Sequence, residues 1–539
     1  MLKKMIPSYI ISFAFSFMIW IYEPITMYAN NLNDLWFDFK TIIGPLLLVF
    51  FIMFLGLSIL FTMVYFISNK IKKILIYKFV LLTSFIIFFI LYIQGNYLTY
   101  NLPVLDGSTI VWNDYKLDSF ISIILIFIVI FTTILFIKKF KYEKVINIFK
   151  YLSLAVFVML FVSLITSFLT TNVLKNKKSY IFTTDNINDV STDKNFYIFM
   201  VDSVDAVEFE NVLNNSEYKD KFTDFTFFKD TVSGYGFTRD SVPFILSGVW
   251  NENKTDFLNY YNESLDNSPL INELKSREYN INLYEMENYW NTDNVKNINN
   301  SVKTTVDVSK FVFYRQEAKY IMYKYFPFFL KKYSLVETMD FNRCKKQGKY
   351  QFFDWNNKKM YDLLKSDKIN SIENKNFSFI HLEGAHVPFD TDKNFNYIKN
   401  GTYNQKILAT MKLINEFLNK LKSNDAYDNS AIIILADHGF NYNEMTGRQN
   451  PLLLIKGINE HHDMYTSKVK TSHEYLQDAY VDLLDGKIST ELFKNIDMNK
   501  PRRFLWYWLY EENHMVEYEQ TGYAWDEDTL IPTGKEFNR

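Results

Sequence analysis

The chain has 539 residues, of which 48% are hydrophobic and 22% are charged, and this balance excludes disordered, collagen-like and low-complexity classes. A formal net charge of −2 and a mean hydropathy of −0.10 are those of an ordinary soluble protein, but both averages conceal an uneven distribution. Residues 1–174 contain 13 lysines and 7 acids, a net charge of +6, and the remainder carries −8. The sequence therefore divides into two parts of different character.

The first part contains five stretches without a charged residue. They are 5–22, 41–69, 79–105, 119–137 and 151–174. Each is close to the ~20 apolar residues that a helix needs to cross the hydrocarbon core of a bilayer. Backbone groups in lipid must be hydrogen-bonded within their own segment, so we predict five membrane-spanning helices. No clear small-residue cleavage site follows the first stretch, and we expect it to be retained rather than removed as a signal peptide.

The lysines between these stretches predict the orientation of the helices. They concentrate at the N-terminus and after the second and fourth stretches: Lys3, Lys4, Lys70, Lys72, Lys73, Lys78, Lys138, Lys139, Lys141, Lys144 and Lys150. The two alternate loops contain only Lys40 and Lys116. By the positive-inside rule the N-terminus is cytoplasmic, and an odd number of spans places residues 175–539 outside. Glu23, at the outer end of the first stretch, is an acid at membrane depth, where such residues often mark functional sites; we favour an interfacial or helix-packing role.

The second part alternates short apolar runs with helical patterns. Residues 175–195 are polar and are predicted to link the transmembrane domain (1–174) to an external domain (196–539). The predicted strands are 196–201, 225–228, 281–284, 377–382, 431–435 and 451–455, and predicted helices lie near 205–213, 241–247, 267–276, 356–366, 403–422 and 473–484. This alternation predicts an α/β domain with a mostly parallel sheet and helices on both faces. Cys344 is the single cysteine, so the domain must rely on a large apolar core rather than on an internal disulfide.

Three of the predicted strands run into acids or histidines. Asp202 follows strand 196–201, His386 lies just beyond strand 377–382, and Asp437 and His438 follow strand 431–435. Each alone is typical of a cap or turn, but ligands of parallel sheets bind beyond the carboxyl ends of the strands, where all three would meet. Carboxylate oxygens and an imidazole nitrogen suit a divalent cation, so Asp202, Asp437 and His438 are candidate metal ligands.

A fourth segment, 233–248 (SGYGFTRDSVPFILSG), places Thr238 at or just before a predicted helix. The free N–H groups and the dipole of a helix N-terminus favour phosphate or sulfate. A metal ion held by the three ligands would bind the Thr238 oxygen, lower its pKa and make it a nucleophile. The alternative is an ordinary threonine N-cap.

The order of Asp, Thr-x-x-Ser-x-Pro, His-x-x-Gly-x-His-x-Pro and Asp-His-Gly resembles the alkaline phosphatase and sulfatase superfamily, from residue 196 to about 485. Five spans before the domain resemble its membrane branch of lipoteichoic acid synthases and phosphoethanolamine transferases. The resemblance implies one divalent metal ion, Mn or Zn, with Mg as a further candidate, and a metal site made of Asp202, Thr238, Asp437 and His438. It implies that Thr238 is the nucleophile and that His386 contacts the transferred phosphoryl group or protonates the leaving or acceptor oxygen. His381 begins the same motif and is expected to be structural.

The sequence also departs from the family patterns. Thr238 occupies the position at which sulfatases carry the Cys or Ser that becomes formylglycine, which disfavours that chemistry. Trp290 keeps the tryptophan of the Trp-x-Arg pair that grips glycerol phosphate in lipoteichoic acid synthases, without the arginine. The histidine usual after Asp-His-Gly is missing, and Arg448 is a candidate source of positive charge there, with a solvated turn arginine as the alternative. Together with His386, Trp290 and Arg448 are the candidate substrate-binding residues.

The expected function is that of a multi-pass phosphotransferase acting on the outer face of a bacterial cell membrane. A phospholipid donor in the bilayer would pass its phosphoglycerol or phosphoethanolamine head group through Thr238 to a surface glycan or teichoic-type polymer, and no nucleic-acid partner is expected. Two alternatives stay open: a metal-dependent hydrolase of phosphodiesterase or sulfatase type, and a catalytically silent partner in cell-envelope assembly. The remaining histidines, His461, His462, His473 and His514, are expected at the surface or in packing.

Overall fold

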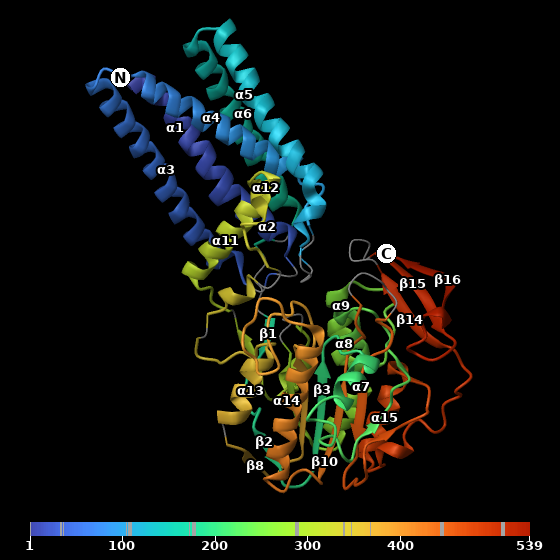
Figure 1. The fold of residues 1–539 in the computed structure, drawn as a ribbon. Coiled ribbons are helices and arrows are strands. Elements are labelled where there is room, and N and C mark those ends of the chain that lie inside the picture. The colour runs from blue at the N-terminus through green and yellow to red at the C-terminus, as the bar shows by residue number, and fades with distance from the viewer. Residues whose placement is uncertain are drawn as a thin grey trace. The chain divides into compact units, whose positions relative to one another are not determined.

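The computed structural model describes residues 2–32, 35, 37–103, 105, 110–171, 173–174, 179–285, 290–304, 306–337, 340–346, 348–366, 368–441, 447–507 and 513–539. The chain forms two compact units, each of which contains a segment from a distant part of the sequence (Figure 1). The first unit combines residues 1–178 with 305–348, and the second combines 179–304 with 349–539.

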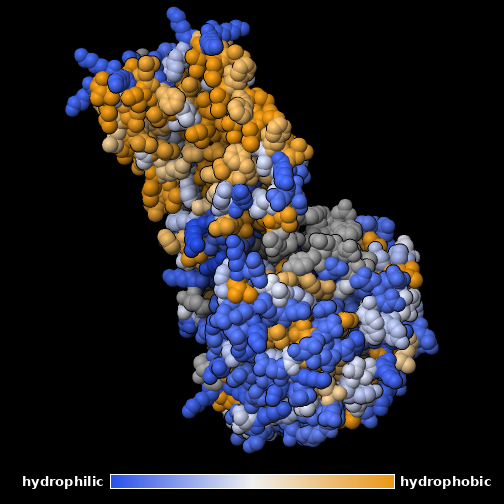
Figure 2. All heavy atoms as spheres, in the orientation of Figure 1, coloured by the Kyte–Doolittle hydropathy of each residue, from blue (hydrophilic) through white to orange (hydrophobic). Residues whose placement is uncertain are grey.

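Within the described part of the first unit, five helices are long and apolar enough to cross a membrane, which confirms the five predicted spans. Their elements are α1 (Leu2–Phe17), the π-helical turn η1 (Met18–Tyr22), α2 (Glu23–Asn30), α3 (Phe39–Lys70), α4 (Leu75–Tyr97), η2 (Trp112–Tyr115), α5 (Lys116–Lys139) and α6 (Tyr142–Thr170). In the second and fourth spans only 11% of the most apolar window is buried. Their apolar side chains therefore face outwards, as Figure 2 shows for this helical unit, and such a surface is suited to lipid.

Residues 305–348 belong to the helical unit and not to the second unit. Their elements are α11 (Lys310–Tyr325), α12 (Phe328–Lys331) and η4 (Asn342–Cys344). The ring of Tyr325 on α11 occupies the space that a Cβ at Gly95 of α4 would need, so the two helices approach closely. This arrangement departs from the expected boundary, which assigned all of 196–539 to one external domain. The physical reason is aromatic packing, for example between Phe313 and Phe37 and between Phe328 and Tyr115.

The second unit is an α/β domain built on a seven-stranded sheet of order β12-β4-β11-β10-β3-β9-β6 within the described residues. The strands are β3 (Asn195–Val201), β4 (Thr226–Phe227), β6 (Asn280–Tyr284), β9 (Asn376–Leu382), β10 (Ser430–Leu435), β11 (Leu453–Lys456) and β12 (Tyr465–Thr466). Strands β10, β3, β9 and β6 run parallel in that order, whereas β11 is antiparallel to both of its neighbours. The mostly parallel sheet and the six predicted strands are thus confirmed.

Helices cover both faces of this sheet, as predicted. One core contains side chains of α7 (Ala206–Asn214), α13 (Asn357–Ser366) and α14 (Tyr403–Lys422). The other contains side chains of α8 (Thr238–Ser247), α9 (Phe257–Asp266), α10 (Pro269–Ser276) and α15 (Leu476–Leu484). Strand β3 contributes Phe199 to the first core and its neighbours Ile198 and Met200 to the second, because successive side chains of a strand point to opposite faces. A strand buried on both faces therefore has the continuous apolar sequence seen here.

Short elements surround the main sheet. They are β1 (Ser179–Phe182) paired with β7 (Ser301–Thr304), β2 (Asp189–Ser191) with β8 (Asn370–Ile372), β5 (Thr231–Val232) with β13 (Thr471–Ser472), and the 3-10 turns η3 (Asp293–Asn297), η5 (His473–Tyr475), η6 (Ser489–Glu491) and η7 (Glu527–Thr529). Strands β1 and β2 lie within 175–195, so the expected linker is in part folded into the domain. Residues 175–178 of that linker lie outside the described residues.

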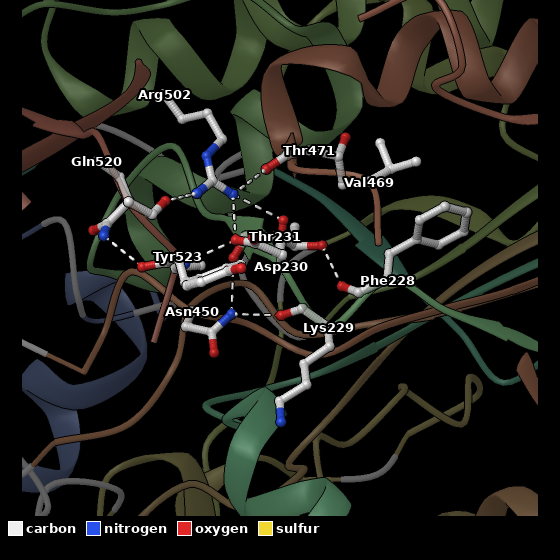
Figure 3. A network of polar contacts seen from close by, with 12 residues as sticks. Phe228, Lys229, Asp230, Thr231, Asn450, Val469, Thr471, Arg502, Gln520 and Tyr523 are labelled. Atoms are coloured by element: carbon white, nitrogen blue, oxygen red, sulfur yellow. Dashed lines mark hydrogen bonds and ion pairs between the residues drawn. The ribbon is translucent and has the colours of Figure 1, made fainter. Parts of the chain in front are cut away.

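The C-terminal segment forms a three-stranded antiparallel sheet of β14 (Arg502–Tyr507), β15 (His514–Gln520) and β16 (Leu530–Asn538). A buried ion pair joins it to the rest of the unit, because Arg502 Nη1 donates to Asp230 Oδ1 over 2.7 Å and to the carbonyl of Thr471 over 3.3 Å (Figure 3). Asp230 Oδ1 also accepts the Ala524 N–H over 2.8 Å. Both charged side chains are almost fully buried, and a buried charge is tolerated only when it is paired in this way.

Candidate active site

Asp202, Asp437 and His438 meet at the carboxyl ends of two parallel strands. Asp202 follows β3 and the other two follow β10, and the register of the pair places Met200 beside Leu435. Ligand atoms of the three side chains all lie within 4.8 Å of one another, and all three residues are buried. The sheet topology therefore brings Asp202 next to Asp437 and His438, which follow it by more than 230 residues along the chain.

Thr238, from helix α8, lies beside the ligand cluster and contacts Asp202. It is the first residue of α8, with Phe237 in the N-cap position, and its Oγ1 donates to Asp202 Oδ2 over 3.3 Å. The first N–H groups of a helix have no partner within that helix, so the hydroxyl lies where an anion is favoured. The structure thus places the candidate nucleophile, a carboxylate and a helix N-terminus together.

The backbone between the ligands is shaped to hold them. Ser203 Oγ donates to Asp202 Oδ1 over 2.6 Å, and the Ser203 N–H donates to Asp437 Oδ1 over 2.9 Å. Ser203 adopts a φ of +57°, an uncommon conformation for a residue other than glycine. Gly384, with a φ of +58°, packs so closely on the Asp202 backbone that a Cβ would overlap its amide and carbonyl. One serine therefore orients both carboxylates, and one glycine permits the close approach of the next loop.

Two atoms in this cluster, Asp437 Oδ2 and His438 Nε2, have a lone pair available for a metal ion. Asp437 is fully buried, and its Oδ2 has no hydrogen-bond donor among the described residues. His438 Nδ1 lies 2.6 Å from the Gly439 carbonyl oxygen, which can only accept, so Nδ1 carries the proton. Nε2 then presents its lone pair 3.3 Å from Asp437 Oδ2. Carboxylate, imidazole and hydroxyl donors in this arrangement fit a divalent cation such as Mn, Zn or Mg.

The histidines around Asp202 keep its carboxyl group ionised. Burial by itself would raise the pKa of Asp202, but nearby His386, and then His381, hold that pKa below its ordinary value. An ionised carboxylate is the form that coordinates a metal ion.

His381 and Glu285 also belong to this site, although the sequence indicated a structural role for the first and did not single out the second. His381 on β9 lies between Glu285, which follows β6, and Asp202. Its Nδ1 is 2.7 Å from Glu285 Oε2 and its Nε2 is 3.5 Å from Asp202 Oδ2. Burial opposes the imidazolium, but the two carboxylates raise the pKa of His381 to about 10. Glu285 carried the same signal as Asp202, an acid directly after a buried strand, and could have been found by it.

His386 lies beside the ligand cluster on the loop after β9. Its Nδ1 is 2.5 Å from the Val387 carbonyl oxygen, and its ring meets Trp355 edge to face, with 5.1 Å between ring centroids. The side chain is partly exposed. Because Nδ1 is held by a carbonyl, Nε2 is the nitrogen available to a substrate.

Arg448 packs on the turn that carries Thr238. Its Nη1 donates to the Gly236 carbonyl and its Nε to the Asn441 carbonyl, both over 3.2 Å. The guanidinium lies 5.0 Å from the ring centroid of Phe237 and 5.7 Å from that of Trp506. The Arg448 guanidinium is therefore held by protein groups beside the candidate nucleophile. These contacts match neither of the two expected roles, which were a solvated turn arginine and a side chain that contacts substrate alone.

Trp290 lies in the core. Its side chain is 0% exposed and packs against Phe182 and Tyr261. The expected substrate contact is corrected, because a fully buried indole cannot reach a bound ligand. His473 is in a packing position, one of the two places expected for it: it is 1% exposed and close enough to His438 that burial and this second imidazole lower its pKa to about 3. It is a core residue near the site, and its ring nitrogens have no hydrogen-bond partner in the described part of the chain.

Comparisons with known proteins identify the family to which the chain belongs. The sulfatase family model matches residues 194–533. None of the curated proteins compared with this chain matches it. Among solved structures, that of Ps i-CgsB is 12% identical, with a TM-score of 0.40 over 61% of this chain and 83% of that one. An alkaline phosphatase superfamily protein from Vibrio parahaemolyticus is 14% identical (TM-score 0.35, 67% and 81% covered). The C-terminal periplasmic domain of EptC from Escherichia coli is 13% identical (TM-score 0.33, 63% and 92% covered).

Proposed function

The chain belongs to the sulfatase family, and on that premise we propose that it is a membrane-anchored, metal-dependent phosphotransferase that moves a phospholipid head group onto a cell-surface acceptor. The observation that carries the proposal is the position of Thr238, which begins α8 and whose hydroxyl donates a hydrogen bond to Asp202 Oδ2. The hydroxyl oxygen of a threonine at this position can act as a nucleophile. It cannot become the formylglycine of sulfatase chemistry, which needs a Cys or Ser precursor.

The ligand cluster prepares that nucleophile. Asp202, Asp437 and His438 would hold one divalent ion, Mn, Zn or Mg, which supplies the positive charge that lowers the pKa of the Thr238 hydroxyl. The Thr238 hydroxyl loses its proton to solvent, the resulting alkoxide attacks the phosphorus of the donor diester, and the bond from phosphorus to the diacylglycerol oxygen breaks. A proton supplied at Nε2 of His386 neutralises the leaving oxygen, which departs as the diacylglycerol hydroxyl.

The second step reverses the first with another alcohol. A hydroxyl of a surface glycan or teichoic-type polymer attacks the phosphothreonine diester, gives its proton to His386, and releases Thr238. In both steps the N–H groups at the start of α8 stabilise the charge on the non-bridging phosphoryl oxygens. The transferred group is phosphoglycerol or phosphoethanolamine.

The five apolar helices give this chemistry a location. With the lysine-rich loops in the cytoplasm, residues 175–539 lie outside a bacterial cell membrane. Anchoring raises the effective concentration of a donor that is itself confined to the bilayer. The second candidate is a hydrolase anchored in the same way, in which water would take the place of the glycan acceptor. Membership of the sulfatase family favours this candidate.

Mass spectrometry of the peptide that contains Thr238 tests the proposal. Full-length protein is incubated with phosphatidylglycerol or phosphatidylethanolamine vesicles, quenched and digested. We expect a phosphoglycerol or phosphoethanolamine adduct on Thr238, absent in Thr238→Ala and retained in the control Thr192→Ala, whose threonine is exposed. Head-group release without any adduct on the wild type would favour the hydrolase, and neither adduct nor release would indicate a silent partner.

A further inference from the structure

Residues 305–348 lie against those ends of the membrane helices that point away from the lysine-rich loops. The Tyr314 hydroxyl on α11 donates to the carbonyl of Pro45, within the first two turns of α3, over 3.0 Å. The Phe328 N–H on α12 donates to Ser122 Oγ, within the first two turns of α5, over 3.2 Å. The segment therefore meets the outward ends of the second and fourth spans, which are the two with the least buried surface.

Helix α11 is also tied to the first span. Glu23 follows the first charge-free stretch, and its side chain is 0% exposed. Its Oε2 accepts from Lys324 Nζ over 2.6 Å and from the Tyr325 hydroxyl over 3.0 Å, both on α11. Together with the contacts to α3 and α5, this ion pair fixes α11 and α12 at the level where the spans end (Figure 1).

Four large apolar or aromatic side chains of this segment are exposed, although the segment contributes no span. They are Phe311 (80%), Phe329 (37%), Tyr333 (61%) and Leu335 (72%). Phe311 lies one helical turn before Tyr314, the residue that bonds to α3. On α3 itself, Leu48 lies one turn beyond the bonded Pro45 and is 58% exposed. The lipid-facing surface of the second span therefore continues onto the start of α11.

The segment is also strongly basic. Nine basic and four acidic residues give 305–348 a net charge of +5, whereas the remaining residues of 175–539 carry −13. The positive-inside rule does not account for this charge, because that rule places lysines on the cytoplasmic side and the segment contacts the opposite ends of the helices. The charge therefore points to an anionic partner on the outer side.

Only part of this charge is neutralised within the protein. Ion pairs in the helical unit engage three of the cations: Lys319 with Asp340, Lys324 with Glu23, and Arg343 with Glu337. Three other basic side chains are exposed and have no acidic partner in the described part of the chain: Lys310, Arg315 and Lys332. Lys310 adjoins Phe311 in the sequence, and Lys332 Nζ lies 5.0 Å from the ring centroid of Tyr333. Free cations and exposed rings thus occur side by side.

This combination selects one kind of partner. Aromatic and leucine side chains among lysines and arginines are typical of surfaces that enter the boundary between lipid head groups and acyl chains. An anionic polymer in water would account for the cations but leave the apolar side chains exposed. A zwitterionic lipid would cover the apolar side chains but gain little from the net charge. An anionic phospholipid satisfies both, because its phosphate attracts the cations and its acyl chains take up the rings.

We propose that residues 305–348 bind the outer surface of the bilayer and select anionic phospholipids there. Phe311, Tyr333 and Leu335 enter the boundary between head groups and acyl chains, and Lys310, Arg315 and Lys332 contact the lipid phosphates. This surface contains none of the residues that the proposed transfer reaction uses. It needs only that the five helices span a membrane, so it does not rest on that reaction.

A fluorescent label at position 311 tests whether this surface lies in the bilayer. Full-length Phe311→Cys is labelled in lipid nanodiscs, and the label enters the new cysteine because Cys344 is 0% exposed. We expect strong quenching by phosphatidylcholine that carries a nitroxide near the head-group end of an acyl chain, and little quenching by aqueous iodide. A label introduced by Asn424→Cys, at an exposed position before β10, should show the reverse. Quenching of the label at 311 by iodide alone would overturn the proposal.

The same label tests the preference for anionic lipid. Quenching by nitroxide-labelled phosphatidylglycerol is compared with quenching by nitroxide-labelled phosphatidylcholine at equal mole fraction. A basic side chain near an anionic surface strengthens binding about fivefold. Phosphatidylglycerol should therefore be preferred several-fold at low ionic strength, and the preference should shrink at high salt, which screens exposed charges. Equal quenching by the two lipids at low salt would contradict the proposal.

Substitutions test whether the three unpaired cations cause the preference. The preference should be lost in a triple variant with Lys310→Gln, Arg315→Gln and Lys332→Gln. It should be kept in a matched triple variant of exposed lysines in the α/β unit, with Lys219→Gln, Lys221→Gln and Lys494→Gln. Thr238→Ala should also keep it, which separates this test from that of the transferase.

Two outcomes of these substitutions would overturn the proposal. One is a preference for phosphatidylglycerol that survives removal of the three cations. The other is a label at position 311 that stays in water and responds to soluble polyphosphate, which would assign the cations to an anionic polymer.

Discussion

Arg448 donates through Nη1 to the carbonyl oxygen of Gly236, two residues before Thr238, over 3.2 Å. Arg448 belongs to the segment that follows Asp437 and His438, so this bond joins the turn of the candidate nucleophile to the loop of two candidate metal ligands. The C-terminal sheet supports the same turn from behind. The Leu505 N–H donates to the Gly234 carbonyl over 2.9 Å, and Phe237 packs on Trp506 and Tyr507 with 4.8 and 4.6 Å between ring centroids.

Replacing Arg448 by lysine should reduce turnover without weakening substrate binding. Lysine keeps the charge but cannot reproduce a planar guanidinium that bonds two carbonyls and stacks on Phe237. A misplaced nucleophile costs about tenfold to a hundredfold in rate. Steady-state transfer measurements should show a lower kcat with KM unchanged, and Arg277→Lys, at an ion pair on the far elements α10 and α15, should leave both constants as they are. A rise in KM alone would instead make Arg448 a substrate contact.

Adding one methyl group at Gly236 should disturb the same turn. A Cβ there would lie 2.5 Å from Cε3 of Trp506, which forces the ring or the turn to move. Overpacking of this kind costs about 1–3 kcal/mol. Chemical denaturation should show lower stability of Gly236→Ala and activity assays a loss of transfer. Gly348→Ala, where no atom lies within 4 Å of the new Cβ, should behave as the wild type; equal stability of the two variants would contradict the packing argument.

The substitution Asp437→Asn should lower the Tm when metal is bound and raise it after the metal has been removed. With metal bound, loss of the charged ligand should weaken metal affinity and lower both Tm and activity. After exhaustive chelation, the wild type retains a fully buried carboxylate with an orphaned Oδ2, whereas asparagine is neutral and easier to bury. Differential scanning calorimetry with and without added Mn or Zn should therefore show the two melting curves exchanging order. A variant less stable than the wild type in both states would argue against a metal at this position.

Glu285→Gln should weaken metal binding through His381. The Glu285 carboxylate holds His381 Nδ1 at 2.7 Å, and Nε2 of the same ring faces Asp202. Loss of an outer carboxylate behind a metal site typically costs about 10- to 100-fold in metal affinity or activity. Competition with a metal indicator measures the affinity, and Glu278→Gln, which lies outside the cluster, is the control. Unchanged affinity with unchanged activity would leave Glu285 a purely structural residue.

Stability should fall with rising pH through the His462–Glu460 pair. Burial opposes the charged imidazole, but the Asp463 carbonyl and the Glu460 carboxylate raise the pKa of His462 above its ordinary value. A raised histidine pKa contributes stability that is complete below the unfolded value of about 6.5 and is lost as the pH rises through the folded value. Unfolding free energies measured from pH 5.5 to 8.5 should therefore decline less in His462→Gln than in the wild type. Parallel curves would remove this pair as the cause.

Local patterns in the sequence determined much of this protein. Charge-free stretches predicted the five apolar helices, because length and hydropathy are properties of a segment alone. Continuous apolar runs predicted the strands of the parallel sheet, because a strand buried on both faces is apolar throughout and can be identified from its own sequence. Asp202, Asp437 and His438 were visible as candidates because each follows such a strand, and parallel strands deliver their ends to one edge.

Only the tertiary structure decided which distant residues meet. Glu23 finds Lys324 in a helix that the sequence assigned to the other domain, and Glu285 finds His381 across neighbouring strands. Trp290, a substrate contact by its motif, is buried in the core. Periodicity shows which face of an element is apolar but not what covers it, because packing and ion pairing depend on shape and charge at positions hundreds of residues apart. The five helices and the parallel sheet were therefore within reach of the sequence, whereas the supports of the nucleophile and the buried charges between helices were not.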